Sequence, residues 1–146
     1  GEIDPAPILW VEGDSACRTL PPEWAADLDQ ALVRGTRFIR EVAFFHHPTK
    51  TLVLTDLIEN YGDETAARLD WKMQIWWRFI FRMWNNPKPA PEYQMGWKDK
   101  AAAKQSLERM LAWNFERIII AHGDLIDSDA KSVAMSAWRS ILETRA

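Results

Sequence analysis

Two polar side chains follow apolar segments that are typical of β-strands. Asp56 comes directly after residues 51–55, and His122 comes directly after residues 118–121. In layered α/β folds the side chains at the carboxyl ends of strands converge on solvent, so ligands collect there. A carboxylate oxygen and an imidazole nitrogen together suit zinc, iron or manganese. The sequence therefore predicts that Asp56 and His122 meet at one sheet edge and ligate a divalent metal such as zinc.

Each candidate also has a structural explanation. A strand-end aspartate often forms a turn or caps a helix, and a single histidine is often a hydrogen-bonded structural residue. His46 and His47 fall in an expected hairpin turn, where exposure to solvent is the simplest interpretation. Because adjacent side chains can point to opposite faces, His46 is kept as a third candidate ligand. Gly123 would let the chain turn away after His122 without crowding a metal.

The elements that position these residues are expected to be strands and helices in mixed order. Apolar runs at 39–45 and 51–58, separated by a turn at Pro48, predict a hairpin covered on both faces. The run at 117–121 predicts a short buried strand of the parallel type. The other expected elements are an edge strand at 8–11, a helical turn at 23–29, a short strand at 31–33, helices at 64–84, 99–113 and 129–143, and a proline-rich loop at 85–97.

Composition fits one α/β domain over residues 1–146, with a mixed sheet, flanking helices and an irregular approach at 1–20. The apolar content of 47% is enough for a real core, and the net charge of −3 argues against a nucleic-acid partner. Cys17 is the only cysteine, so no internal disulfide can form, and we expect a reducing, cytoplasmic location. We expect neither a signal peptide nor a membrane span, since no apolar run is long enough.

Residues 69–84, called the Trp-rich segment below, are apolar around most of a helix and carry Lys72, Arg78 and Arg82. A core helix, a subunit interface and a membrane-surface helix are all consistent with this composition. The acidity of the whole chain ranks membrane contact last. At a period of 3.6, we assign one stripe to an interface (Trp77, Phe81 and Trp84) and the neighbouring stripe to the core (Leu69, Met73, Trp76 and Ile80).

Three segments carry a family resemblance. They are 22–35, 41–60 with EVAFFHHPTKTLVLTDLIEN, and 113–123 with WNFERIIIAHG. Together they resemble a bacterial family of domains of unknown function that is related to the metallo-β-lactamase-like hydrolases. The resemblance covers roughly residues 20–142 apart from the Trp-rich segment. It implies the C-terminal half of a four-layer αββα sandwich.

The resemblance also implies roles for individual residues. An Asp at the position of Asp56 bridges two metals in that superfamily, and a late strand-end His at the position of His122 ligates one of them. His46 lies where the family hairpin also has His, whereas His47 departs from the expected Arg. The first, His-rich ligand cluster has no counterpart, because no His precedes His46.

These ligands are too few for a two-metal centre, because zinc alone takes about four. The resemblance thus implies a metal-dependent hydrolase-like domain that is incomplete or inactive as this chain alone. A homo-oligomer or a partner chain would supply the missing half. The alternative is a non-catalytic binding or assembly subunit that uses the sheet and the Trp-rich segment as its interface.

Overall fold

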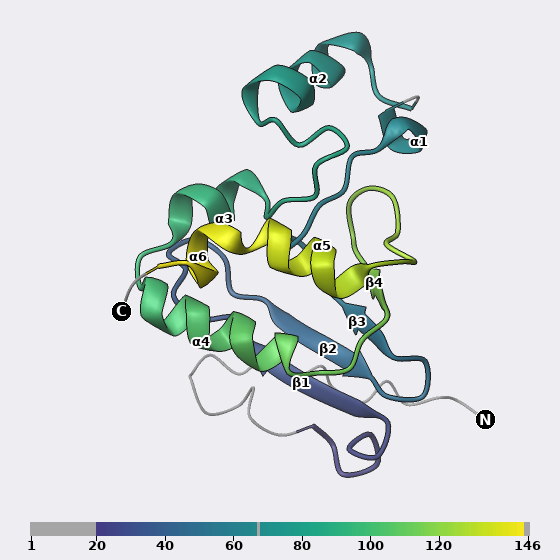
Figure 1. The fold of residues 1–146 in the computed structure, drawn as a ribbon, viewed down its shortest axis with the longest axis vertical. Coiled ribbons are helices and arrows are strands. Elements are labelled where there is room, and N and C mark those ends of the chain that lie inside the picture. Colours follow the sequence, from purple (N-terminus) through teal and green to yellow (C-terminus); the bar gives the residue numbers. More distant parts are fainter. Residues whose placement is uncertain (1–19, 67, 145–146) are drawn as a thin grey trace, which may run out of the picture.

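The sheet is built on the hairpin expected from the two apolar runs. The computed structural model describes residues 20–66 and 68–144 and places β2 (Val42–His46) antiparallel to β3 (Thr51–Val53). The first strand, β1 (Leu28–Leu32), is antiparallel to β2, and β4 (Arg117–Ile119) is parallel to β3. The order is β1-β2-β3-β4 (Figure 1). The chain is therefore an α/β domain with a mixed sheet, and the parallel character expected at 117–121 is confirmed.

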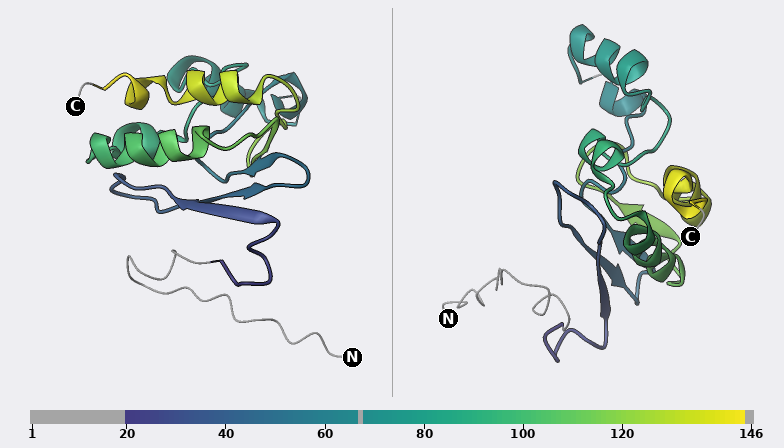
Figure 2. Two further views of the ribbon diagram at one scale, coloured as in Figure 1. Left: turned by 60° about the horizontal axis from the view of Figure 1, so that its bottom comes forward. Right: turned by 90° about the vertical axis from the view of Figure 1, so that its left-hand side faces the viewer.

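One face of the sheet is covered by three helices. These are α4 (Lys100–Leu111), α5 (Ala130–Ala137) and α6 (Arg139–Leu142), which lie together on the same side in both views of Figure 2. Alternate strand residues point into this layer, because successive side chains of a strand face opposite sides. The largest side chains of this core are Leu52, Leu54, Leu107, Met110, Ile118, Trp138 and Ile141, each at most 2% exposed.

The opposite face of the sheet carries no helix within the part of the chain that the structure describes (Figure 2). Phe44 pairs with Val53, and Val53 pairs with Ile119, so these three side chains share that face. Ile119 is 45% exposed, and the other two are half-buried. Val42 lies on the same face, two residues before Phe44. These four residues form the open sheet face. The expectation that both faces are covered is therefore not met among the described residues.

Several expected boundaries are wrong for local reasons. The predicted helical turn at 23–29 stops earlier, because Leu28 already begins β1. The predicted loop at 85–97 contains a helix, α3 (Pro91–Gly96), with Pro91 in its first turn, where proline costs no hydrogen bond. The predicted helix at 129–143 is divided at Trp138 into α5 and α6. The edge strand expected at 8–11 lies outside the described residues.

The helix predicted over 64–84 is broken into three pieces. The first, α1 (Asp63–Ala66), is separate from α2 (Trp71–Ile75), whose first turn is capped by Asp70 through the N–H groups of Lys72 at 2.8 Å and Met73 at 2.9 Å. The chain continues directly into a π-helix, η2 (Trp76–Ile80). It ends where Arg82 adopts a positive φ of 52°. Among the described residues, every helix is too short or too polar to cross a bilayer.

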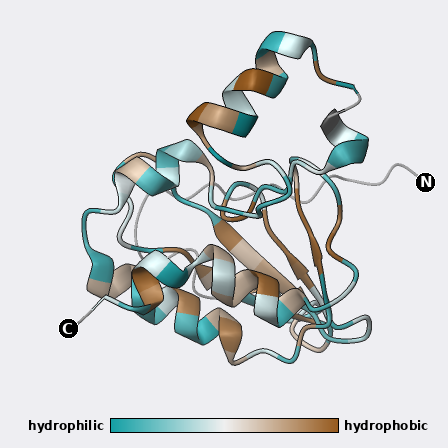
Figure 3. Cartoon of the chain, turned by 45° about the horizontal axis from the view of Figure 1, so that its top comes forward, coloured by the Kyte–Doolittle hydropathy of each residue, from teal (hydrophilic) through white to brown (hydrophobic). Residues whose placement is uncertain are grey.

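The stripe of the Trp-rich segment that was assigned to the core lies largely on solvent in the structure, and the interface assignment of the other stripe stays a prediction. Met73, Trp76 and Ile80 were expected in the core but are 40%, 52% and 59% exposed. Trp77, Phe81 and Trp84, expected at an interface, are half-buried, and Trp77 stacks on Tyr61 within the chain. The helical spacing separates the two stripes but does not decide which of them faces the rest of the chain; the stacking of Trp77 on Tyr61 decides it. Figure 3 shows apolar residues on this helix, which lies away from the sheet.

Trp138 is the buried link between the helical layer and the segment that follows β3. Its indole Nε1–H donates to the Leu57 carbonyl at 3.1 Å, and its side chain is 1% exposed.

Trp138→Phe should lower the free energy of unfolding by about 1–3 kcal/mol, because a buried carbonyl loses its donor and a void is left. Urea denaturation measures this change. Met135→Ala, at an exposed position of α5, should stay within about 0.5 kcal/mol. Equal losses in both variants would contradict the assignment.

Candidate metal site

The parallel pairing of β3 and β4 brings Asp56 and His122 to one edge of the sheet. Asp56 follows the end of β3, and His122 follows the end of β4. The Nε2 atom of His122 lies 3.4 Å from Oδ1 of Asp56. The Asp56 side chain is 32% exposed and that of His122 is 55% exposed, so both reach solvent. The expected convergence of the two side chains is confirmed, and their ligation of a metal stays a prediction.

Glu59 joins this pair, although the sequence analysis gave it no role. One ligand atom each from Asp56, Glu59 and His122 lie within 4.8 Å of one another. Glu59 is buried, and its Oε2 atom has no hydrogen-bond partner. A buried carboxylate oxygen without a partner is costly unless a cation or donor satisfies it. In the sequence, Glu59 could have been found from its position three residues after Asp56, just after a strand.

A buried carboxylate fixes the turn that carries Asp56. Glu41 Oε1 accepts the N–H of Thr55 at 2.6 Å, and Oε2 accepts the N–H of Asp56 at 3.1 Å. The Tyr93 hydroxyl also donates to Oε2, at 3.1 Å. The Asp56 carbonyl in turn accepts the N–H of Ala90 at 2.8 Å. The Asp56 backbone is therefore held from both sides, by the start of β2 and by the start of α3.

Burial shifts the pKa values of Glu41 and Tyr93. Desolvation raises the pKa of Glu41, and the hydrogen bonds from Thr55, Asp56 and Tyr93 partly oppose that rise. Burial, followed by the charge of Glu41, raises the pKa of Tyr93 far above its ordinary value. The tyrosine therefore stays a donor to the carboxylate at all ordinary pH values.

Gly123 allows the two strand-end loops to touch. It has a φ of 106°, and a Cβ built there would lie 2.0 Å from the carbonyl oxygen of Asn60. Asn60 donates its N–H to the His122 carbonyl at 3.2 Å and accepts the N–H of Asp124 at 2.7 Å. No other residue type fits this approach without moving the backbone. The glycine expected to leave room around His122 is thus needed for backbone contact between the two loops.

The site concentrates negative charge. Burial raises the pKa of Glu59 to about 7, and the neighbouring charges of Asp56 and Glu92 add to the rise. Burial likewise raises the pKa of Tyr61 to about 12, with the same carboxylates contributing. A cation among these oxygens would favour their ionised forms. The electrostatics of the site therefore fit a metal ion.

A cavity of about 380 Å³ opens beside these residues. Glu59 and His122 form its polar end, while Tyr61, Trp77 and Phe81 contribute an aromatic wall. The rings of Tyr61 and Trp77 stack at 4.2 Å, and those of Trp77 and Phe81 lie 5.2 Å apart. The inner side of the Trp-rich segment thus borders the candidate metal site.

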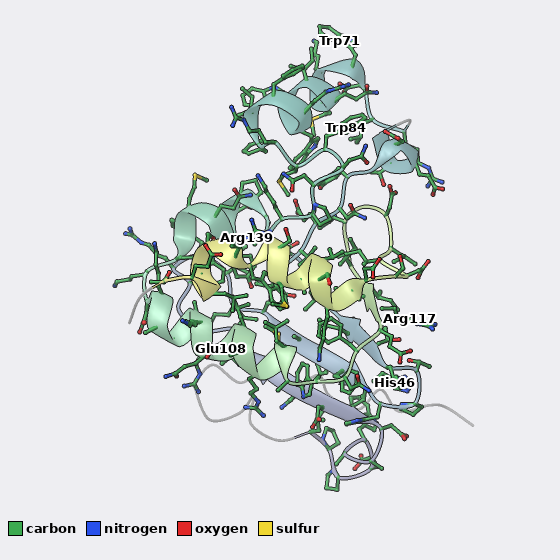
Figure 4. All side chains as sticks on the ribbon, viewed as in Figure 1. His46, Trp71, Trp84, Glu108, Arg117 and Arg139 are labelled. Carbon is green, nitrogen blue, oxygen red and sulfur yellow. The ribbon has the colours of Figure 1, made fainter. Side chains whose placement is uncertain are left out.

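The structure does not bring His46 to this site. His46 pairs with Thr51 at the beginning of β3, whereas Asp56 lies beyond the other end of that strand. Its Nδ1 atom bonds the Thr49 hydroxyl at 2.7 Å within the hairpin turn. Figure 4 shows His46 at the hairpin end of the sheet. His47 contacts Asp29 at 3.2 Å instead. His46, the last residue of β2, and His47, in the turn, therefore make their contacts at the hairpin end of the sheet and not at the candidate metal site.

Comparisons with models of known protein families, with characterised proteins and with solved structures find no match. The donor set therefore has to be judged by its own chemistry. One imidazole and two carboxylates give three protein ligands, the same number as in catalytic zinc sites that keep a further position open. Nitrogen and oxygen donors of this kind suit zinc, manganese or iron.

Glu41→Gln tests whether the buried carboxylate holds the site. A glutamine has one acceptor oxygen, so it cannot serve the N–H groups of both Thr55 and Asp56. We expect a loss of about 1–3 kcal/mol in unfolding free energy, measured by urea denaturation. Glu108→Gln, on the exposed side of α4, is the matched control and should have little effect. A Glu41→Gln variant as stable as the parent would contradict this role.

Proposed function

We propose that Asp56, Glu59 and His122 form a metal site of a hydrolase-like centre, of which this chain supplies one part. The observation that carries the proposal is the 3.4 Å approach of His122 Nε2 to Asp56 Oδ1, with a ligand atom of Glu59 within 4.8 Å of both. These side chains come from segments far apart in sequence. Their position at a sheet edge beside a cavity is typical of functional sites in α/β folds.

The simpler alternative is a structural Asp–His ion pair. Two observations favour a metal site over that alternative. A surface ion pair does not need Glu59, whose buried Oε2 has no partner. An ion pair also does not explain why a third carboxylate lies near the first two: burial, and then the charges of Asp56 and Glu92, raise the pKa of Glu59. A divalent cation bound there would activate a water or polarise a carbonyl oxygen, which is the chemistry of metal-dependent hydrolysis.

The resemblance to metallo-β-lactamase-like hydrolases supports the same proposal. It assigned metal roles to Asp56 and His122 from sequence, and these two side chains are in contact. It also predicts that ligands for a second metal come from another half of the fold. We therefore propose a partially complete centre in this chain, with Glu59 as an additional ligand of the metal it holds.

Metal titration tests the proposal directly. Calorimetry with Zn²⁺ and Mn²⁺ should show one ion per chain, bound more weakly than at a closed four-ligand site. Asp56→Asn, Glu59→Gln and His122→Gln should each weaken binding by about tenfold or more, because each removes a proposed ligand.

The matched control is His46→Gln, which removes the same side chain at the other end of the sheet. It should leave metal affinity unchanged. Equal losses in His46→Gln and His122→Gln would show nonspecific histidine binding and sink the proposal. Unchanged affinity in all three ligand variants would do the same.

A second candidate function is assembly, either as a homo-oligomer or with a partner chain. The observation that favours it is the open sheet face, where Phe44, Val53 and Ile119 present apolar side chains in one row. This face ends at the same strand edge as Asp56 and His122. A second sheet packed on it would bring its own strand ends toward the candidate metal site, which is how a partner would complete the centre.

Ile119→Lys tests assembly through this face. The change places a charge in the apolar row, so any oligomer that buries the row should dissociate. Light scattering should show association in the parent chain and a monomer in the variant. Leu125→Lys, at another exposed apolar position, is the control and should leave association unchanged. A monomeric parent chain at all concentrations would exclude the homo-oligomer.

A further inference from the structure

The outer face of the Trp-rich segment is not used by the proposed metal site. No residue of α2 or η2 is buried. Trp71, Trp76 and Phe79 are 66%, 52% and 65% exposed, and Met73, Ile75 and Ile80 on the same helix are also exposed. We call these six residues the aromatic patch. In Figure 1 and Figure 4 the helix that carries it projects beyond the sheet and the covering helices, with Trp71 near its tip.

The helix has an inner and an outer side. Trp77 stacks on Tyr61 at 4.2 Å, Phe81 contacts Trp77, and the following Met83 is fully buried. These contacts attach the segment to the rest of the chain. The same arrangement leaves the aromatic patch exposed to solvent. A soluble monomer seldom exposes so many large apolar side chains in one place, so the patch is expected to contact another surface.

Charge identifies the kind of surface. Residues 71–84 contain three cations, Lys72, Arg78 and Arg82, and no acid, in a chain whose net charge is −3. Lys72 Nζ lies 5.7 Å from the centre of the Trp71 ring, and Arg78 Cζ lies 5.5 Å from that of Trp84. The adjacent Asp70 carboxylate accepts two backbone N–H groups as the helix cap. A long basic side chain beside an exposed aromatic ring, as at Lys72 and Trp71, is typical of helices that lie in a membrane interface, whereas Arg78 lies beside the half-buried Trp84.

We propose that the aromatic patch docks this chain onto a lipid bilayer surface that carries anionic headgroups. The apolar side chains would enter the boundary between headgroups and acyl chains, and the three cations would meet lipid phosphates and carboxylates. The helix is too short to span, so the contact is peripheral. Residues 71–84 carry no acid, although Asp70 adjoins them and the whole chain is acidic, so the charge of the segment itself complements an anionic surface.

A second copy of the chain fits the patch less well. In a two-fold symmetric pair the same patch meets itself. Lys72, Arg78 and Arg82 of one copy would then face the same three cations of the other. Like charges brought together in this way disfavour association, whereas an anionic bilayer complements them.

Vesicle flotation tests the proposal with the full chain and a chelator present, so the result does not depend on the metal site. The parent chain should bind phosphatidylcholine vesicles that contain phosphatidylserine, more weakly at high salt, and bind pure phosphatidylcholine far less. The double variant Trp76→Ser with Phe79→Ser should lose about tenfold or more in partitioning, because two exposed rings are removed. Arg78→Glu should reduce the preference for the anionic vesicles.

The matched control is Leu125→Ser with Met135→Ser, which removes two exposed apolar side chains elsewhere. It should bind vesicles like the parent. Circular dichroism checks that each variant is folded, and Arg78→Glu provides a second test if the double variant is not. Absence of binding to anionic vesicles, or an equal loss in the control, would overturn the proposal. Self-association that the patch variants abolish, without vesicle binding, would assign the patch to a second copy and overturn it as well.

Discussion

A single buried carboxylate fixes the sheet edge that carries the candidate metal site. Glu41 lies just before β2, yet both of its oxygens accept N–H groups from the turn after β3, and Tyr93 of α3 donates to the same group. Burying a carboxylate costs free energy unless hydrogen bonds compensate for the lost water, and three donors do so here. Glu41 thus links the hairpin, the turn after β3 and α3. The position of Asp56, and with it the distance to His122, depends on this one side chain.

The candidate site and the Trp-rich segment share a wall. Trp77 and Phe81 border the cavity that Glu59 and His122 close at its polar end. The opposite side of the same short helix carries Trp76 and Phe79 on solvent. The wall of the cavity and the exposed Trp76 and Phe79 are therefore carried by the same short helix.

The sequence predicted the parts of the fold that follow from short-range pattern. The hairpin, the parallel strand and the helix predicted over 99–113 are confirmed, the last as α4 with Asp99 as its cap, since apolar runs, turn residues and capping side chains determine them locally. The meeting of Asp56 and His122 was predictable because parallel strands end at the same edge. Glu59 was missed because its burial depends on tertiary packing. The core stripe of the Trp-rich segment was wrong because periodicity reveals neither the break at Asp70 nor which side of a short helix faces the rest of the chain. The register between β2 and β3 pairs His46 with Thr51, at the end of the sheet that lies away from Asp56.

The parallel pairing of β3 with β4 has a consequence for how the chain folds. Strand β3 ends at Val53 and its partner begins only at Arg117, so α1 to α4 must be closed into one large loop before the pair can form. Such long-range pairing is slow, because the entropy of loop closure is lost before the contacts that repay it exist. The antiparallel hairpin can form early, from neighbouring residues. Asp56, Glu59 and His122 therefore come together only when the last strand has docked. A ligand that needs all three would bind the completed fold alone and would slow its unfolding.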